Sequence, residues 1–316
     1  MSKSYTPGLK IKSNTKVVKL RQLPMLGKTH VQVDSKVKYS DIVASTEIPG
    51  NVHMINISRE LNIEPNKINE VIKVKVDEAV TEGMIIAQNS GIFGLFKTEV
   101  KSPVNGFISN ISNVTGQVII SEPMIPIEVD SYIDGKVIKI IANEGVEIET
   151  NAALIQGIIG IGKEKNGILK ILSSNELKSN NLDIKGCIVV IPKYINLEIY
   201  KKIESFGASG LIVGGFDYND LSNLIGKSLG VAVTGNEDIN TTLIITEGFG
   251  QINMSTSTFN LLSNFEGYNA SINGATQIRA GVMRPEIVIP INEDSSKSDN
   301  KIEDSIISIG SKIRVI

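Results

Sequence analysis

The sequence has little of the chemistry that most metal and redox sites require. Its 316 residues include one cysteine, two histidines and no tryptophan. A single cysteine excludes an internal disulfide, a cysteine-based zinc site and an iron–sulfur cluster. Cys187 begins the apolar run 187–191, which is typical of a buried strand, so we expect a core residue and not a nucleophile. We therefore expect neither a metal nor a cofactor.

A basic excess is also missing. The formal net charge of −2 argues against a nucleic-acid interface that extends over the whole chain. The first 40 residues are locally basic, and Asp34 is their only acidic residue. Two interpretations of this basic arm stay open: a solvated strand face, or a contact with phosphates, an acidic partner or a membrane surface.

Long apolar runs are absent as well. No stretch approaches the roughly 18 apolar residues that a membrane-spanning helix needs. Residues 1–16 lack the apolar core of a signal peptide. We therefore expect a cytoplasmic protein without a membrane span.

Residues 1–172 are predicted to form β-structure, because short Val- and Ile-rich runs alternate with Gly, Asn, Asp and Pro. Two segments repeat, VQVDSKVKYSDIVAS at 31–45 and VKVDEAVTEGMIIAQ at 74–88. The repeat predicts two copies of one strand–turn–strand unit. Between the copies, residues 58–70 are predicted to form a helix with Ser58 as its N-cap.

The second copy is followed by the segment KSPVNGFI at 101–108. The pattern over residues 25–130 resembles the lipoyl/biotinyl-like barrel-sandwich hybrid, in which a V-x-V-G-D-x-V-x-x-G-x-x-I-A phrase precedes a segment such as s-P-v-x-G-x-I. Its order also resembles the N-terminal part of the Rnf-type and sodium-pumping quinone reductase peripheral subunits. That part of the resemblance implies no electron transfer here, because the cluster cysteines are missing.

The lipoyl-like resemblance also implies a hairpin tip between the two halves, where the family carries its modified lysine in D-K-A or M-K-M. Neither tripeptide occurs in residues 89–97, and Lys97 is the one alternative for such a lysine. The same segment contains an apolar run that either plugs the end of a barrel or docks a protein partner. The partner-binding candidates are Ile92, Phe93, Leu95 and Phe96.

After about residue 180 the pattern changes to apolar strands that alternate with helices. This alternation predicts a mostly parallel sheet with βαβ crossovers. The fold class is thus α/β plus β. The predicted parts are a lipoyl-like barrel-sandwich β domain at 1–130, an additional β hairpin unit at 131–180, an α/β domain at 181–290, and a flexible linker with a short β tail at 291–316.

Ligands of parallel α/β sheets bind beyond the carboxyl ends of the strands. Glycines there let backbone N–H groups approach a ligand, and two nearby arginines can clamp a carboxylate or a phosphate. The alternative is that Gly and Thr only end the strands and that the arginines pair with glutamates. The candidates for binding a small anionic ligand are Gly214, Gly215, Thr234, Gly235, Thr246, Glu247, Gly248, Asn273, Thr276, Arg279 and Arg284.

These observations leave three functions open. The first is a non-catalytic accessory or scaffold protein that binds a protein partner through its lipoyl-like β module. The second is a small-ligand-binding protein or an enzyme that uses the strand-end loops, without assignable catalytic residues, because no carboxylate there has an evident acid–base partner. The third is a nucleic-acid-associated protein that uses the basic arm and the tail at 306–316, whose phrase resembles the start of a KOW-type barrel.

Overall fold

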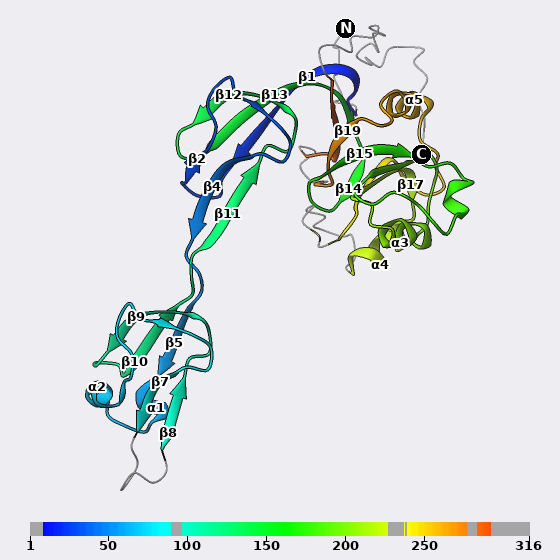
Figure 1. The fold of residues 1–316 in the computed structure, drawn as a ribbon. Helices are drawn as coiled ribbons and strands as arrows, with labels where there is room; N and C mark the ends of the chain where they lie inside the picture. Colours follow the sequence, from blue (N-terminus) through cyan, green and yellow to red (C-terminus); the bar gives the residue numbers. More distant parts are fainter. Residues whose placement is uncertain (1–8, 90–96, 227–236, 238, 277–282, 292–316) are drawn as a thin grey trace, which may run out of the picture. The chain divides into compact units, whose positions relative to one another are not determined.

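The computed structural model describes residues 9–89, 97–226, 237, 239–276 and 283–291 (Figure 1). Strands make up 46% of the described residues and helices 15%. The predicted mixture of α and β structure is therefore confirmed, with strands in the majority. Within the described ranges, no helix is long and apolar enough to cross a membrane. The predicted tail lies outside these ranges, apart from Ile291.

The chain forms two compact units, and the second is an insertion into the first. Unit 1 contains residues 1–22, 29–44 and 129–316, and unit 2 contains residues 23–28 and 45–128. This division differs from the predicted parts, because strands from the first 44 residues of the chain pair with strands that follow residue 134.

The later part of unit 1 is built on one large mixed sheet. Its strands are β13 (Gly145–Gln156), β14 (Ile159–Ile161), β15 (Lys165–Ile171), β16 (Ile188–Ile191), β17 (Gly210–Phe216), β18 (Thr242–Phe249), β19 (Asn269–Asn273) and β20 (Glu286–Pro290). Strands β15, β16, β17 and β18 are parallel neighbours in this order. Antiparallel β14 lies beside β18, and on the far side of β15 the antiparallel strands β19, β20 and β13 follow.

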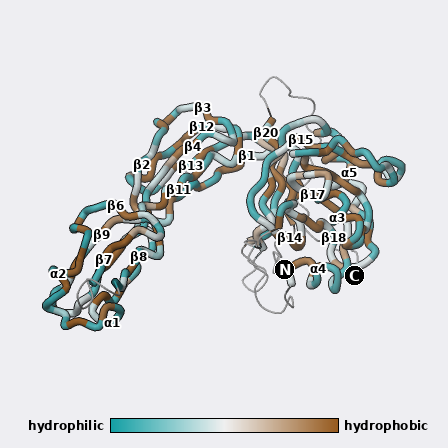
Figure 2. The backbone as a smooth tube through the Cα atoms, turned by 60° about the horizontal axis from the view of Figure 1, so that its bottom comes forward, coloured by the Kyte–Doolittle hydropathy of each residue, from teal (hydrophilic) through white to brown (hydrophobic). Residues whose placement is uncertain are grey.

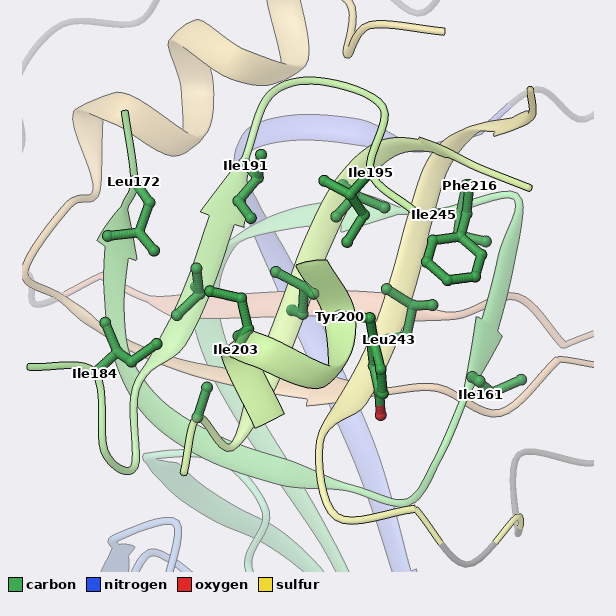
Figure 3. Close-up of a cluster of buried hydrophobic side chains, with 14 of the residues drawn as sticks. Ile161, Leu172, Ile184, Ile191, Ile195, Tyr200, Ile203, Phe216, Leu243 and Ile245 are labelled. Atoms are coloured by element: carbon green, nitrogen blue, oxygen red, sulfur yellow. The ribbon is translucent and has the colours of Figure 1, made fainter. Parts of the chain in front are cut away.

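Helices cover both faces of the parallel strands. They are α3 (Leu197–Ser205), α4 (Tyr218–Ile225) and α5 (Thr256–Asn264). Val189 and Ile191 of β16 face the core that contains Tyr200 of α3 (Figure 3), whereas Ile188 faces the core that contains Leu262 of α5. Because successive strand residues point to opposite faces, both faces need apolar side chains. The strands of this sheet are accordingly mostly hydrophobic in Figure 2.

The start of α3 and the position of Cys187 are fixed by local bonds. Asn196 caps α3, and its side chain accepts a hydrogen bond from Ile199 N over 3.1 Å. Cys187 lies one residue before β16 and is only partly buried, although it packs against the same core. The strand begins at Ile188 because Cys187 N is used by a turn bond to Ile184 O.

Residues 17–44 and 129–149 form a small β module that we call the host module, and all of them except residues 23–28 belong to unit 1. Its strands are β1 (Ile11–Gln22), β2 (Lys28–Thr29), β3 (Lys36–Val37), β4 (Ile42–Ile48), β11 (Ile125–Asp130), β12 (Gly135–Ile141) and the first half of β13. Strands β3, β12, β13 and β1 lie in this order and continue the large sheet, whereas β2, β4 and β11 form a second sheet in this order.

Unit 2 contains a second module of the same design, which we call the inserted module (residues 45–128). Its strands are β5 (Val52–Asn56), β6 (Ala79–Val80), β7 (Ile85–Asn89), β8 (Thr98–Lys101), β9 (Gly106–Ser112) and β10 (Gln117–Ser121). One sheet has the order β6, β9, β10 and β5, and the other pairs β7 with β8. On its other side β7 has a single bridge, between Ala87 and Ile72. In the host module the corresponding position beside β4 is occupied by β2.

The predicted repeat at 31–45 and 74–88 has the same backbone in both copies. Asp34 and Asp77 occupy equivalent positions, and each has a φ of 70°. Asp34 N donates to Val137 O over 2.8 Å, and Asp77 N donates to Ile108 O over the same distance. The positions of Val137 and Ile108 extend the equivalence beyond the segments in which the sequence repeats.

The second half of each module is equivalent too. Residues 131–137, SYIDGKV, correspond to residues 102–108, SPVNGFI. Ser131 Oγ donates to Ile133 O, and Ser102 Oγ donates to Val104 O, both over 2.6 Å. Their ladders also have a bulge at the same place, after Val137 in one module and after Ile108 in the other. One module is therefore inserted into a second copy of itself.

The predicted helix at 58–70 is wrong in its extent and in its cap. Instead the structure has α1 (Ile57–Glu60), the 3-10 turn η1 (Pro65–Lys67) and α2 (Ile68–Val71). Pro65 disfavours a helical conformation at Glu64, whose ψ is 142°. Asn56 caps α1 by accepting from Arg59 N, whereas Ser58 is buried and donates to Gly116 O.

Candidate functional site

The predicted strand-end glycines contact the backbone of a neighbouring segment. A Cβ at Gly214 would lie 2.3 Å from Met254 N, and a Cβ at Gly215 would lie 2.3 Å from Gly250 O. The missing side chains therefore make room for the segment 250–254. That segment lies where a ligand would have to approach these two glycines.

The polar candidates on β18 also have partners inside the fold. Thr246 Oγ1 donates to Val213 O over 3.1 Å, and Glu247 accepts from Ser255 N over 2.8 Å at the start of α5. Gly248 is the exception, because it has a φ of +122° and its Cβ would meet no atom closer than 3.9 Å. These bonds match the alternative in which the candidates end strands and support helices.

The candidates in the segment 273–286 are divided in the same way. Thr276 Oγ1 accepts from Gly160 N, and Asn273 Oδ1 accepts from Ala275 N, both over 2.8 Å. Arg284 is partly exposed. The remaining ligand candidates, Thr234, Gly235 and Arg279, and the partner candidates Ile92, Phe93, Leu95 and Phe96 lie outside the described residues. Ligand binding at the strand ends stays a prediction.

The packing of Gly214 leads to a test of its role. We expect Gly214→Ala to lower the free energy of unfolding by about 2–4 kcal/mol, because the new methyl group meets backbone atoms that cannot move independently. Urea unfolding followed by circular dichroism measures this change. A variant that keeps full stability would contradict the structural role and restore Gly214 as a ligand contact.

The structure also brings together charged residues that the sequence analysis did not select. Arg21 of β1 donates two hydrogen bonds of 2.9 Å to the carboxylate of Glu164. It also donates to the carboxylate and to the backbone carbonyl oxygen of Asp130. The guanidinium lies 5.4 Å from the ring centre of Tyr132. Lys19 pairs with Glu286 beside the same ring.

The surroundings of Tyr132 in this charged cluster keep its hydroxyl protonated. Burial raises the pKa of the Tyr132 hydroxyl well above its usual value, and the nearby carboxylates of Glu286 and Glu164 raise it further. A phenol that stays protonated cannot act as a base near neutral pH. Each cation in the cluster already pairs with a carboxylate. We therefore assign the cluster a structural role, in which it holds β1 against β20 and against the start of β15.

The paired cations also bear on the basic arm. Four of its residues form ion pairs with acids from elsewhere in unit 1: Lys16 with Glu149, Lys19 with Glu286, Arg21 with Glu164, and Lys38 with Asp134. Four of the nine positive charges in the first 40 residues are thus paired within the fold. Among the described residues, no group of three His, Cys, Asp or Glu side chains could hold a metal ion.

The most distinctive surface lies on the inserted module, on the outer face of the β6–β9–β10–β5 sheet. Val52, Ser121 and Phe107 lie side by side across three of its strands, and Met54 lies beside Ile119. Val52 is 60% exposed, Met54 70% and Phe107 48%. None of the residues in these four strands is Lys, Arg, Asp or Glu. We call this surface the uncharged face.

The host module provides an internal comparison, because its equivalent face is charged. Glu149 occupies the position of Ser121, Lys136 that of Phe107, and Glu147 that of Ile119, according to the registers of the two sheets. Lys16 pairs with Glu149 over 3.0 Å. Val18 and Leu20 of the host face occupy the positions of Val52 and Met54, so the two faces differ in their charged residues and at the position of Phe107.

The sequence signal for this face was present but was spread over four short strands. Outward residues of one sheet come from 52–54, 79, 107–110 and 119–121. Periodicity within a strand shows alternation, but it does not show which strands share a sheet. No protein-family model matches the chain, and no curated protein is significantly similar to it.

Proposed function

We propose that the chain is a non-catalytic accessory or scaffold protein that binds a protein partner through the inserted module. The observation that carries the proposal is the uncharged face, with Val52, Met54 and Phe107 exposed. Exposed apolar patches of this kind are typical of interaction sites, and aromatic residues and Met are enriched in protein interfaces. The host module has Lys136 at the position of Phe107, so the module itself does not require an apolar side chain there.

The lipoyl-like resemblance is part of the same proposal. Each module has a row of four neighbouring strands, which in the host module is part of the large sheet, and a second, smaller sheet; such an arrangement is compatible with a barrel-sandwich hybrid. In the host module, β4 and β11 correspond to β7 and β8, and the chain between β4 and β11 is the inserted module. The hairpin tip at which the family carries its modified lysine is therefore replaced in the host module by a whole second module, which favours a role without a covalent cofactor.

A capture experiment with one altered residue tests this function. We expect Phe107→Lys to weaken partner binding at least tenfold, because a lysine there would be desolvated in the interface without an acidic partner. The tagged chain is incubated with lysate of its native cells at low salt, and the captured protein is then purified and titrated against both forms.

The host module supplies the matched control. Leu20 is equivalent to Met54 by register and is 51% exposed. Leu20→Lys therefore adds the same charge at a similar exposure, and we expect it to leave partner binding unchanged. Equal binding by the Phe107→Lys variant would contradict the proposed surface. An intact mass that shows a covalent group on Lys97 would contradict the non-catalytic role.

A further inference from the structure

Strand β5 is an end strand of its sheet and has none of the features that protect such strands. Among the described residues of unit 2, β10 is its only strand neighbour. The β5–β10 register continues through five consecutive pairs without a bulge, from Val52 to Asn56. Natural proteins block exposed edges with charges, Pro, bulges or very short strands, because unpaired backbone groups attract further strands.

The other edges show that this protein uses such protection elsewhere. The opposite end of the same sheet is β6, which is only two residues long. In the host module, β1 occupies the position of β5, and it contains the charged residues Lys19 and Arg21 at positions where β5 has His53 and Ile55. The inserted module therefore lacks both the charged residues that the host module has on the equivalent face and those that it has on the equivalent edge strand.

The open edge of β5 offers regular backbone groups. Asn51 O accepts a hydrogen bond from Glu122 N over 2.9 Å, so Asn51 directs its backbone groups toward the β10 side. Because successive residues alternate in an antiparallel pair, Val52 and Met54 direct theirs toward the open side, whereas the carbonyl of Asn56 begins α1 as its N-cap. The His53 imidazole is occupied on the inner side by its 2.6 Å contact with Glu122.

We propose that β5 pairs antiparallel with β5 of a second copy of this chain, around a twofold axis through Met54. The inference goes beyond the proposed function, since it uses the edge of the sheet and leaves Phe107 free for another partner. In this pairing Met54 lies opposite Met54, and Val52 lies opposite Asn56. No charge opposes its like, so the strand is complementary to itself, as a twofold interface requires. The two uncharged faces then form one continuous surface.

The test is the oligomeric state of the purified full-length chain across a wide concentration range, measured by sedimentation velocity. We expect a reversible dimer for the natural sequence. Met54→Pro removes the N–H group that the proposed pair needs, and a proline is tolerated where that group points away from the sheet. We expect this variant to associate at least tenfold more weakly.

Two further variants keep the outcome interpretable. Val52→Lys places a charge on the edge of each copy and is expected to weaken association in the same way, whereas Leu20→Lys adds it to the host module and is expected to leave the dimer intact. A circular dichroism spectrum like that of the natural sequence shows that each variant is folded.

The outcomes separate this inference from the proposed function. A chain that stays monomeric, or a dimer that survives both Met54→Pro and Val52→Lys, would overturn the pairing of β5. A dimer that is lost in Phe107→Lys but kept in Met54→Pro would also overturn it, because that result indicates packing of two faces. In each of these cases, loss of the captured partner in Phe107→Lys would still support the scaffold function.

Discussion

Replacing residues 49–124 by Asn-Gly is expected to leave unit 1 folded and to abolish partner binding. The chain leaves unit 1 through β4 and returns through β11, and these strands are neighbours in one sheet. Asn-Gly is the preferred two-residue connection between such strands. Apart from Leu23, the buried hydrophobic residues of unit 2 form one cluster from Ile55 to Ile120, and none of this cluster belongs to a core of unit 1.

Cooperative urea unfolding of the shortened chain, together with a near-native stability, is the expected result. The capture experiment on the same protein should recover no partner, since the uncharged face is gone. A shortened chain that is unfolded would mean that the host module depends on the inserted module for its own structure. A shortened chain that still binds the partner would move the interaction to unit 1.

Replacing Arg21 by Met is expected to lower the free energy of unfolding by about 2–4 kcal/mol. Arg21 is only 13% exposed, and its loss would leave Glu164 and Asp130 without the cation that both carboxylates share. Removing one partner of a buried ion pair typically costs about 3–5 kcal/mol, and we expect less here because Asp130 is 45% exposed and Glu164 36%.

The control for Arg21 is an ion pair of the host module that is open to solvent. Lys139 pairs with Glu147 over 3.2 Å and is 62% exposed. We expect Lys139→Met to change the stability by less than about 1 kcal/mol. Both free energies of unfolding are measured with urea at one pH and salt concentration. Equal decreases for the two variants would show that the cluster around Tyr132 stabilises the fold no more than a solvent-exposed ion pair does.

The repeat at 31–45 and 74–88 could be predicted because six of its fifteen aligned positions are identical. The second half of the module was harder, since SYIDGKV and SPVNGFI share only Ser and Gly at matched positions. Those two residues have specific roles: the hydroxyl donates to the carbonyl two residues ahead, and at Gly106 a Cβ would lie 2.4 Å from Ser121 O. The structure retains the bonds, while the sequence retains few identities.

Other features depend on contacts between distant residues and could not be predicted. The glycines at 214 and 215 have the same sequence pattern whether they face a ligand or a backbone segment. Only the position of residues 250–254 decides between these possibilities. The charged cluster draws Arg21, Asp130 and Glu164 from three separate parts of the chain, and no local pattern connects them.

The nesting of one module in the other has a consequence for the order of folding. The host ladder between Val37 and Gly135 must close a loop of nearly one hundred residues. The inserted module lies wholly within that loop and has its own core, so it can fold first during synthesis. Its folding would bring the ends of the loop together and so reduce the effective length of the loop. The free-energy cost of closing the host ladder would then fall by about 0.6 kcal/mol for each halving of that length. The insertion would then act as an internal folding aid, and variants that destabilise its core should slow the folding of the host module.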